Sequence, residues 1–542
     1  MHHNAEQSET SAHPVRLGLV LAGVFGVLSV VLLWPGHLAI TAHEVDVLHA
    51  LDAAMRIVDG QRQHIDFMTP LGVLSFAPLA VGLAAGWSIS TAFMVSNILV
   101  CLALLPAIFH VSFGRMGKYA TVFGVLMVLL PMGLMFGGSA PVISMSMQYN
   151  RWAWTVAILC IVIILVPNAR PTPVRDGIIL GTGLAALALT KMTFFICLAP
   201  VIGIALAIDR EFRALAWMLG AGLAVALWAS LIFGGVDFWL AYAHDLFLVQ
   251  SSETRSHPGK SLTDIIASPA RMLQTVVLLA AVIALRQSGR QRAGLILLLL
   301  APAFFFITYQ NWGNDPKWLL LLGFLALIWA GQPAPGPVFG QDSRTVFLIL
   351  AAVSFSLIAP SFFNIATSPF RNMMADRAKF IPLLPNASAP DFLIERKRSF
   401  DSLATIDLPI QPDPQETEPK EPIALDGYRF ADCGQSLGYM GKMHEIAADL
   451  VAAGHAGKRI LFVDVGNPLP LLGDFPRLPG RAPWYYGGDG GVKEAEIAVI
   501  PRCPVGAGPF REMMKELDAF SDDWRLIEEA THYQIFTSAR TP

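Results

Sequence analysis

Residues 17–39 read LGLVLAGVFGVLSVVLLWPGHLA, an apolar run that contains no acidic residue, lysine or arginine. The hydrocarbon core of a bilayer is about 30 Å thick, and a helix needs about 20 predominantly apolar residues to cross it. This run is long enough to cross. It follows a polar tail, residues 1–16, and no small-residue cleavage site follows it. We therefore expect a retained membrane anchor and not a cleaved signal peptide.

Comparable apolar runs recur through the first two thirds of the chain. Of its 542 residues, 54% are hydrophobic and 15% charged, whereas soluble proteins carry about 25% charged residues. The sequence predicts an all-α polytopic transmembrane bundle of about 11–13 spans over residues 17–360. The net charge of −3 gives no indication of a nucleic-acid partner. The candidate spans are 17–39, 71–87, 91–113, 120–138, 152–167, 177–191, 192–208, 214–234, 270–285, 293–309, 317–331 and 344–360.

A different pattern follows the last apolar run. Residues 361–424 are rich in Pro, Asp and Glu in their second half, which indicates a linker or irregular segment. Residues 425–542 alternate helical and buried-strand patterns, which predicts a small soluble α/β domain. Within it we expect helices over 438–453 and 509–519, buried strands over 459–465 and 495–501, and one or two closing strands within 524–537.

The short loops carry clustered basic residues, which usually lie on the cytoplasmic side of a membrane. The clusters are Arg115/Lys118, Arg170/Arg175, Arg210/Arg213 and Arg286/Arg290/Arg292. With these inside, the loops 40–70 and 236–268 and the soluble domain face outward. The expected location is the bacterial inner membrane, crossed many times, with a periplasmic C-terminal domain. This arrangement requires that one hydrophobic segment within 71–113 does not cross fully. Arg371, Arg377 and Lys379 favour the opposite placement of the soluble domain.

Five cysteines are spread over the two parts of the chain. Cys101, Cys160 and Cys197 lie in apolar spans, where cysteine is usually a small packing residue. Cys433 and Cys503 lie in the soluble domain. If that domain is exported, they could form a disulfide; the alternative is two unpaired thiols.

The most polar stretch near the membrane follows the first span. Residues 41–49 read TAHEVDVLH, and residues 60–72 read GQRQHIDFMTPLG. Glu44 and Asp46 would diverge by about 200° on a helix, so at most one of them would point into a cleft; on an extended segment they would share a face. The alternative is that both carboxylates cap the helix predicted over 47–58, which has the apolar stripe of a helix lying on a membrane surface.

These motifs resemble the GT-C superfamily of integral membrane glycosyltransferases, which includes protein O-mannosyltransferases and the aminoarabinose transferase of lipid A. The resemblance covers about residues 17–360. It rests on the acidic pair, the interfacial helix, the DFMTPLG motif that ends at Gly72, the ALTK motif that ends at Lys191, and the outer loop 236–268. The departure is the spacing of the acidic pair, which is Glu44-x-Asp46 where the family has adjacent residues.

The resemblance implies an inverting transfer of a sugar from a polyprenyl-phosphate donor to an acceptor on the outer face. Such a transfer needs a carboxylate as base, for which Asp46 is preferred over Glu44. It also needs groups that bind the donor phosphate and stabilise it as it leaves. The candidate substrate- and phosphate-binding residues are Asp66, His64, Arg151, Lys191, Arg255, His257 and Lys260.

Each candidate also has a plain structural interpretation. Asp66 could cap a turn, Lys191 could extend from a helix end towards the interface, and Arg151 could anchor that interface beside Trp152. Residues 253–260 could be a solvated loop, and the turn-rich residues 311–317 could either meet sugar or phosphate or form a plain turn.

The sequence leaves the function open between three classes. The first is the glycosyltransferase, whose acceptor could be a protein, a lipid or a polysaccharide. The second is a transporter or flippase of a lipid-linked or polar solute, and the third is a non-catalytic polysaccharide-binding protein of the envelope. Membrane lipids are expected partners of all three. No residue cluster predicts a metal site, and dependence on a divalent metal stays open.

Overall fold

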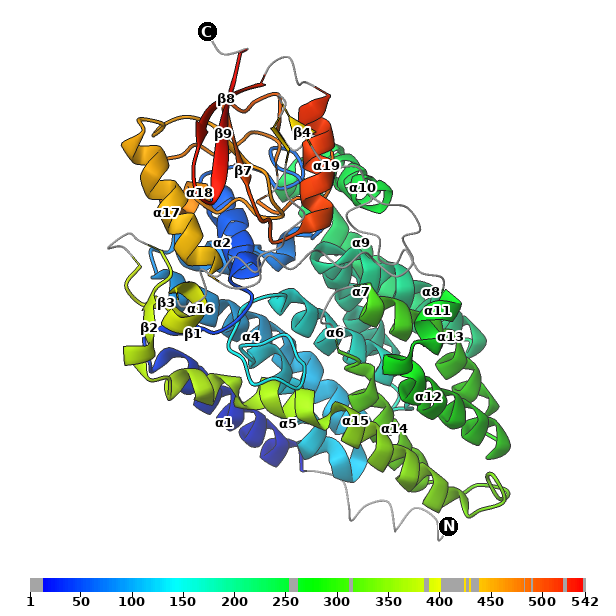
Figure 1. The fold of residues 1–542 in the computed structure, drawn as a ribbon. Helices are drawn as coiled ribbons and strands as arrows, with labels where there is room; N and C mark the ends of the chain where they lie inside the picture. The colour runs from blue at the N-terminus through cyan, green and yellow to red at the C-terminus, as the bar shows by residue number, and fades with distance from the viewer. Residues whose placement is uncertain are drawn as a thin grey trace.

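The computed structural model describes residues 13–252, 262–310, 315–384, 389–400, 424–425, 428–429, 438–481, 483–488, 491–519 and 524–539. They form a helical bundle with a small α/β domain at one end (Figure 1). This confirms the predicted fold class.

Within the described residues, seven helices are long and apolar enough to cross a membrane, so the chain is a multi-pass membrane protein. They are α1 (Pro14–Leu33), α4 (Ile89–Arg115), α6 (Gln148–Leu165), α7 (Pro173–Thr190), α9 (Phe212–Phe233), α13 (Gln291–Tyr309) and α15 (Ser343–Met373). Four further helices of the bundle are α5 (Ala120–Met132), α8 (Met192–Ile208), α12 (Pro269–Gln287) and α14 (Trp318–Ala330).

The surface of α9 shows why this bundle needs a lipid environment. Only 11% of its apolar window is buried inside the protein, and its exposed side chains include Leu223, Leu227 and Leu231. An apolar face of this length would be unstable in water. The opposite face of α9 packs closely on α7 because glycine lines the contact: a Cβ added at Gly181 would lie 2.2 Å from the carbonyl oxygen of Met218.

The basic loops meet at one end of the bundle, which we call the basic end. Arg115 donates to Asp176 at 2.8 Å, and Arg292 forms an ion pair with Asp209. A cavity of about 370 Å³ is lined by Arg115, Asp176, Asp209 and Arg292 together. The loops predicted to be cytoplasmic therefore share one end. The soluble domain and α2 (Glu44–Val58) lie at the other end, which we call the α2 end (Figure 1).

The hydrophobic segment 71–87 contains the helix that does not cross. It forms η1 (Val73–Ser75) and α3 (Ala77–Ala84), and α3 has only 8 residues. At 1.5 Å per residue α3 is about 12 Å long, too short for a bilayer. The chain then turns back into α4, whose first turn is capped by the Ser88 side chain. Because α3 stays at the α2 end, α4 carries Arg115 to the basic end.

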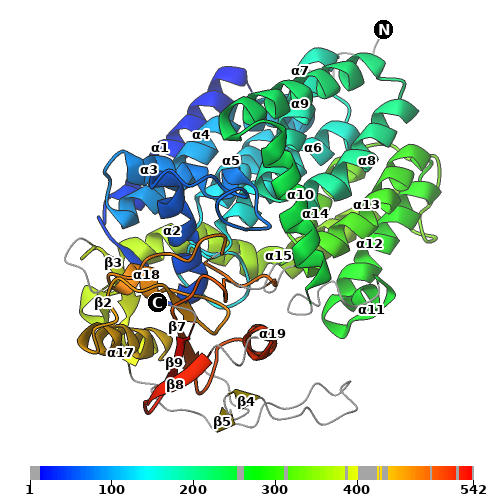
Figure 2. The same cartoon turned by 90° about the horizontal axis from the view of Figure 1, so that it is seen from above.

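The soluble domain is built on a four-stranded sheet in the order β6-β7-β9-β8. Strands β6 and β7 are parallel, and β9 is antiparallel to both of its neighbours. The predicted helices and strands of this domain are all present. They are α17 (Tyr439–Ala452), β6 (Ile460–Phe462), β7 (Ile497–Pro501), α19 (Ala507–Asp518), β8 (Trp524–Glu529) and β9 (Tyr533–Ser538). The domain also contains the short helix α18 (Leu469–Leu472), which was not predicted. The sheet and α17 lie beside α2 and away from α12 and α13 (Figure 2).

A second, three-stranded sheet joins distant parts of the chain. Leu38–Ile40 (β1) pairs in parallel with Phe392–Glu395 (β3), which pairs with Phe380–Pro382 (β2). The last apolar helix, α15, continues to Met373, beyond the predicted end of the span at residue 360. The segment after α15 therefore returns to the first span and adds strands beside it.

The remaining elements are short or lie at the ends of the bundle. The predicted outer loop 236–268 is largely helical where it is described. The elements are η2 (Gly117–Tyr119), α10 (Val236–Ser251), α11 (Leu262–Ala267), η4 (Arg377–Lys379), α16 (Arg396–Phe400), β4 (Ala424–Leu425) and β5 (Tyr428–Arg429).

Candidate functional site

The two candidate carboxylates lie in the first turn of α2. His43, the residue before this helix, has a left-handed backbone with φ 58°, which turns the chain sharply after β1. Negative charge is favourable at a helix N-terminus because of the helix dipole, and Glu44 and Asp46 both occupy this turn. The helix α2 is covered on one side by the bundle and on the other by the soluble domain, and 10 of its 15 residues are buried. This helix does not lie open on a membrane surface as the apolar stripe suggested, because the soluble domain covers it.

Glu44 is buried and neutralised. Its side chain is 3% exposed, and its carboxylate accepts a hydrogen bond of 2.6 Å from the Nε of Arg398. Arg398 comes from α16, which follows the returning strand β3. Removing one partner of a buried ion pair leaves the other charge buried without compensation, which is strongly destabilising. Glu44 therefore joins α2 to the segment that follows the bundle.

Asp46 points in another direction and is only half-buried. Its Oδ2 accepts a hydrogen bond of 2.8 Å from the Ser146 hydroxyl. Ser146 belongs to residues 133–147, which join α5 to α6 and which we call the 133–147 connection. The two carboxylates thus diverge as their spacing on a helix predicts.

The 133–147 connection has no regular secondary structure in its described residues, although it begins within an apolar run. Side chains satisfy its backbone. Asn364 donates to the carbonyl oxygens of Gly138 and Ser139 at 3.1 and 2.8 Å, and Arg371 donates to that of Val142 at 3.0 Å. Irregular backbone at membrane depth is tolerated only where protein buries it or where it lines a cavity. These hydrogen bonds fix the backbone of the 133–147 connection, which lies next to the first turn of α2.

Three cations surround the start of α6, where the connection ends. Arg151 is fully buried and donates to the carbonyl oxygens of Met135 and Gly133, each at 2.7 Å. Lys317 donates to the carbonyl oxygen of Phe136 at 2.8 Å and is paired with Asp315. Both therefore brace the 133–147 connection in this structure.

Lys191 occupies the break between α7 and α8. Its ammonium donates to Asn150 Oδ1 at 3.3 Å and lies 5.9 Å from the centroid of the Tyr149 ring. The N–H groups of the first turn of an α-helix point outward and favour anions. Asn150 and Tyr149 belong to the first turn of α6, so Lys191 lies beside a helix N-terminus. This combination suits a phosphate.

His64 and Asp66 hold the loop after α2 and do not adjoin Asp46 through any described contact. The buried His64 ring pairs with Asp245 of α10 at 2.8 Å and stacks on Tyr242 with 4.2 Å between ring centroids. Burial raises the pKa of the Asp245 carboxyl, and the hydrogen bond from His64 opposes this effect. Asp66 accepts from the backbone N–H of Arg62 at 2.6 Å. The hydrogen bond from the Arg62 guanidinium, at 3.2 Å, is the main cause that lowers the pKa of Asp66, a turn residue at the surface, and the backbone hydrogen bond adds to it.

Some predicted residues lie outside the part of the chain that the structure describes. They are Arg255, His257, Lys260, Cys433 and residues 311–314. The disulfide between Cys433 and Cys503 therefore stays a prediction. Within the described residues, no group of three or more His, Cys, Asp or Glu side chains is arranged to hold a metal ion.

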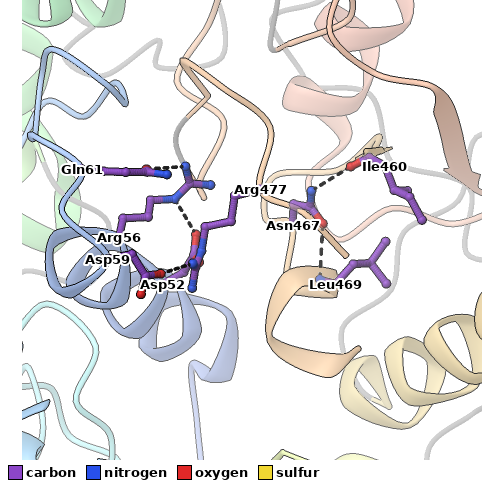
Figure 3. Close-up of polar contacts among 8 residues, drawn as sticks. All are labelled: Asp52, Arg56, Asp59, Gln61, Ile460, Asn467, Leu469 and Arg477. Carbon is purple, nitrogen blue, oxygen red and sulfur yellow. Dashed lines mark hydrogen bonds and ion pairs between the residues drawn. The ribbon is translucent and has the colours of Figure 1, made fainter. Parts of the chain in front are cut away.

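An ionic contact fixes the soluble domain on α2 (Figure 3). Arg477 donates to Asp52 at 2.5 Å and to Asp59 at 2.6 Å. Asp52 also accepts from Arg56 at 2.9 Å. In the same domain the side-chain amide of Asn467 donates to the carbonyl oxygen of Ile460 in β6 at 3.2 Å.

Three residues of this region could not be singled out from the sequence. Ser146 is one of several small residues in an apolar stretch, and Arg398 and Arg477 are ordinary charges in segments without a motif. Their partners are more than 90 residues away along the chain. The signal that the sequence does hold is the spacing of Asp52 and Arg56 in the helix predicted over 47–58, since residues four apart share one face of a helix.

Comparisons with known proteins give matches to solved structures alone. No protein-family model matches the chain, and no curated protein matches it. Among solved structures, a cryo-EM structure of the arabinofuranosyltransferase AftD from mycobacteria aligns with 98% of this chain at 12% identity and a TM-score of 0.41. A mutant form of that protein aligns with 97% at 13% identity and a TM-score of 0.38. The chain spans 40% and 42% of the length of these structures.

Proposed function

We propose that this protein is a membrane glycosyltransferase that moves a sugar from a polyprenyl-phosphate donor to an acceptor hydroxyl at the α2 end, with inversion at the anomeric carbon. The α2 end would face the periplasm of a bacterial inner membrane. The observation that carries the proposal is the separation of the two carboxylates. Glu44 is consumed by an ion pair with Arg398, whereas Asp46 is half-buried and held by a hydroxyl.

Asp46 suits the role of general base. The Ser146 hydroxyl orients the Asp46 carboxylate, and the side chain is partly exposed, so an acceptor can approach it. In the proposed step the acceptor oxygen attacks the anomeric carbon while its proton passes to Asp46. The bond between that carbon and the phosphate oxygen breaks, and polyprenyl phosphate leaves with the electron pair. General-base catalysis of this kind typically contributes 10²–10⁴-fold to a rate.

Lys191 suits the donor phosphate. It lies beside the first turn of α6, and the phosphate leaves with increased negative charge, which a fixed cation stabilises in the transition state. Arg151 and Lys317 add positive charge close to the same turn while they brace the 133–147 connection. Their contribution is the field they create, because both Nη atoms of Arg151 and the Nζ of Lys317 already donate to protein groups.

The test compares Asp46→Asn with Glu44→Gln in the purified full chain. Each variant is given a panel of synthetic polyprenyl-phosphate sugars and a membrane glycan extract, and mass spectrometry measures both released polyprenyl phosphate and glycosylated product. We expect Asp46→Asn to lose at least 100-fold in rate, and Glu44→Gln to lose less than about tenfold. Asp376→Asn, an exposed substitution of the same kind after α15, is the matched control.

Two results would contradict the proposal. Full activity of Asp46→Asn would remove this carboxylate as the base. Failure of the unsubstituted protein to consume any donor of the panel would remove the donor class, and with it the interpretation of Lys191.

A further inference from the structure

A cleft separate from Asp46 opens where the soluble domain meets the bundle. Its volume is about 310 Å³, at the lower end of the range for small-ligand pockets. Three parts of the chain enclose it: Met68 of the loop after α2, Leu248 of α10, and a set of soluble-domain residues. The soluble-domain residues are Pro479, Gly480, Arg481, Trp484, Tyr485, Tyr486, Gly487, Gly488, Gly491 and Glu494. Because the walls come from both parts of the protein, the cleft exists only when the domain is docked on α2.

Arg481 places a buried guanidinium in the wall of this cleft. The residue is 6% exposed, and one of its Nη atoms donates to the Phe462 carbonyl oxygen at 3.2 Å. Its Nε and other Nη have no hydrogen-bond partner among the described residues. Burial lowers the pKa of Arg481 to about 10, so it stays charged at neutral pH. Unpaired buried donors cost free energy, and ligand oxygens in the adjoining cleft would satisfy them.

The rest of the wall combines an aromatic face with a carboxylate. Trp484 is half-buried and Glu494 is half-buried, and both line the cleft. Aromatic rings present a large apolar face at low entropic cost, which suits the C–H face of a sugar ring. Hydroxyl groups both donate and accept. A cleft lined by both a carboxylate and a guanidinium with unpaired donors therefore matches a polyol better than it matches a polyanion.

The cleft is linked to Asp46 through α2. His49 lies three residues after Asp46, and residues at this spacing are neighbours on one face of a helix. The His49 ring lies 5.8 Å from the Trp484 ring and 6.0 Å from the Tyr486 ring, between centroids. The aromatic wall of the cleft thus begins one helical turn from the carboxylate.

We propose that this cleft binds a sugar residue of a neutral glycan, and that this glycan is the acceptor of the transfer. The second part rests on the proposed function; the first part does not. Trp484 would stack on the sugar ring, Arg481 would donate to its oxygens, and Glu494 would accept from a hydroxyl. The reacting hydroxyl would then extend along α2 towards Asp46.

Direct binding to the full chain in detergent separates the two parts. Saturation-transfer NMR measures the affinity for neutral oligosaccharides of pentoses and hexoses, with an oligouronate as the anionic comparison. We expect Trp484→Ala and Glu494→Gln to weaken binding of the preferred neutral glycan at least tenfold. The matched controls Trp87→Ala and Glu528→Gln, which lie outside the cleft, should bind as the unsubstituted protein does. Thermal melting confirms that each variant is folded.

The outcomes are distinguishable from those of the transfer assay. If Asp46→Asn is inactive but binds glycan normally, both proposals stand. If Trp484→Ala raises the KM for the glycan with little change in kcat, the bound glycan is the acceptor. Preference for the oligouronate would overturn the assignment to a neutral glycan. Absence of binding to every oligosaccharide, or binding unaffected by both cleft substitutions, would overturn the site itself.

Discussion

Replacing Arg477 with methionine tests whether ion pairs hold the soluble domain on α2. Arg477 spans two carboxylates, and the pair with Asp52 is nearly buried, with side-chain exposures of 16% and 2%. Breaking a buried ion pair costs about 3–5 kcal/mol. Asp52 keeps its second partner, Arg56, which reduces the cost to about 2–3 kcal/mol. The pair with Asp59 is half-exposed and adds less than about 1 kcal/mol.

The expected total of about 3 kcal/mol corresponds to roughly a 100-fold change in an equilibrium constant. Hydrogen exchange of the α2 amides measures it, because the local opening that exposes them requires the domain to lift. We expect these amides to exchange about 100-fold faster in Arg477→Met. Arg459→Met is the matched control, since its pair with Glu496 lies within the soluble domain at 3.4 Å. If α2 exchange stays within threefold of the unsubstituted protein, the ion pairs do not hold this contact.

Two further predictions concern pH and orientation. Burial lowers the pKa of Lys442 to about 8, and the nearby Asp464 opposes this effect. Between about pH 8 and 10.5 the unfolded chain therefore binds more protons than the folded chain. The contribution of Lys442 to the free energy of unfolding rises with pH across that window, by at most about 3 kcal/mol. Lys442→Met should remove this slope from chemical denaturation curves, and an unchanged slope would refute the assignment. In intact cells, an impermeant maleimide should label Glu528→Cys from outside the inner membrane but label Lys118→Cys only after permeabilisation. The reverse pattern would invert the proposed orientation.

The helices of the bundle and the elements of the soluble domain were predictable because each depends on a local run of residues. Long apolar runs specify membrane helices, and buried runs such as 495–501 specify interior strands. The partial crossing within 71–113 could also be inferred, because two full crossings there would have placed Arg115 on the opposite side of the membrane from the other basic loops. These predictions needed no knowledge of distant contacts.

The candidate site could be predicted only in part. The sequence left open whether Glu44 and Asp46 diverge, as on a helix, or share a face, as on an extended segment, and it did not indicate which one is paired. That choice depends on Arg398, which lies 354 residues away. The irregular 133–147 connection resembled the end of a span because its residues are small and apolar. Its shape is fixed by hydrogen bonds from Asn364, Arg371 and Arg151. These side chains belong to helices outside the connection, and the local sequence does not indicate that they contact it.

The parallel pairing of β1 with β3 has a consequence for biosynthesis. Leu38 to Ile40 leave the ribosome early, yet their partners at Phe392 to Ile394 are made late. At about 5–20 residues per second, the interval between Glu44 and Arg398 is roughly 20–70 s. During that time most of the apolar helices enter the bilayer while the start of α2 still lacks its partners. The carboxylate-bearing turn is therefore completed among the last steps of assembly, so a truncated chain would insert without acquiring it.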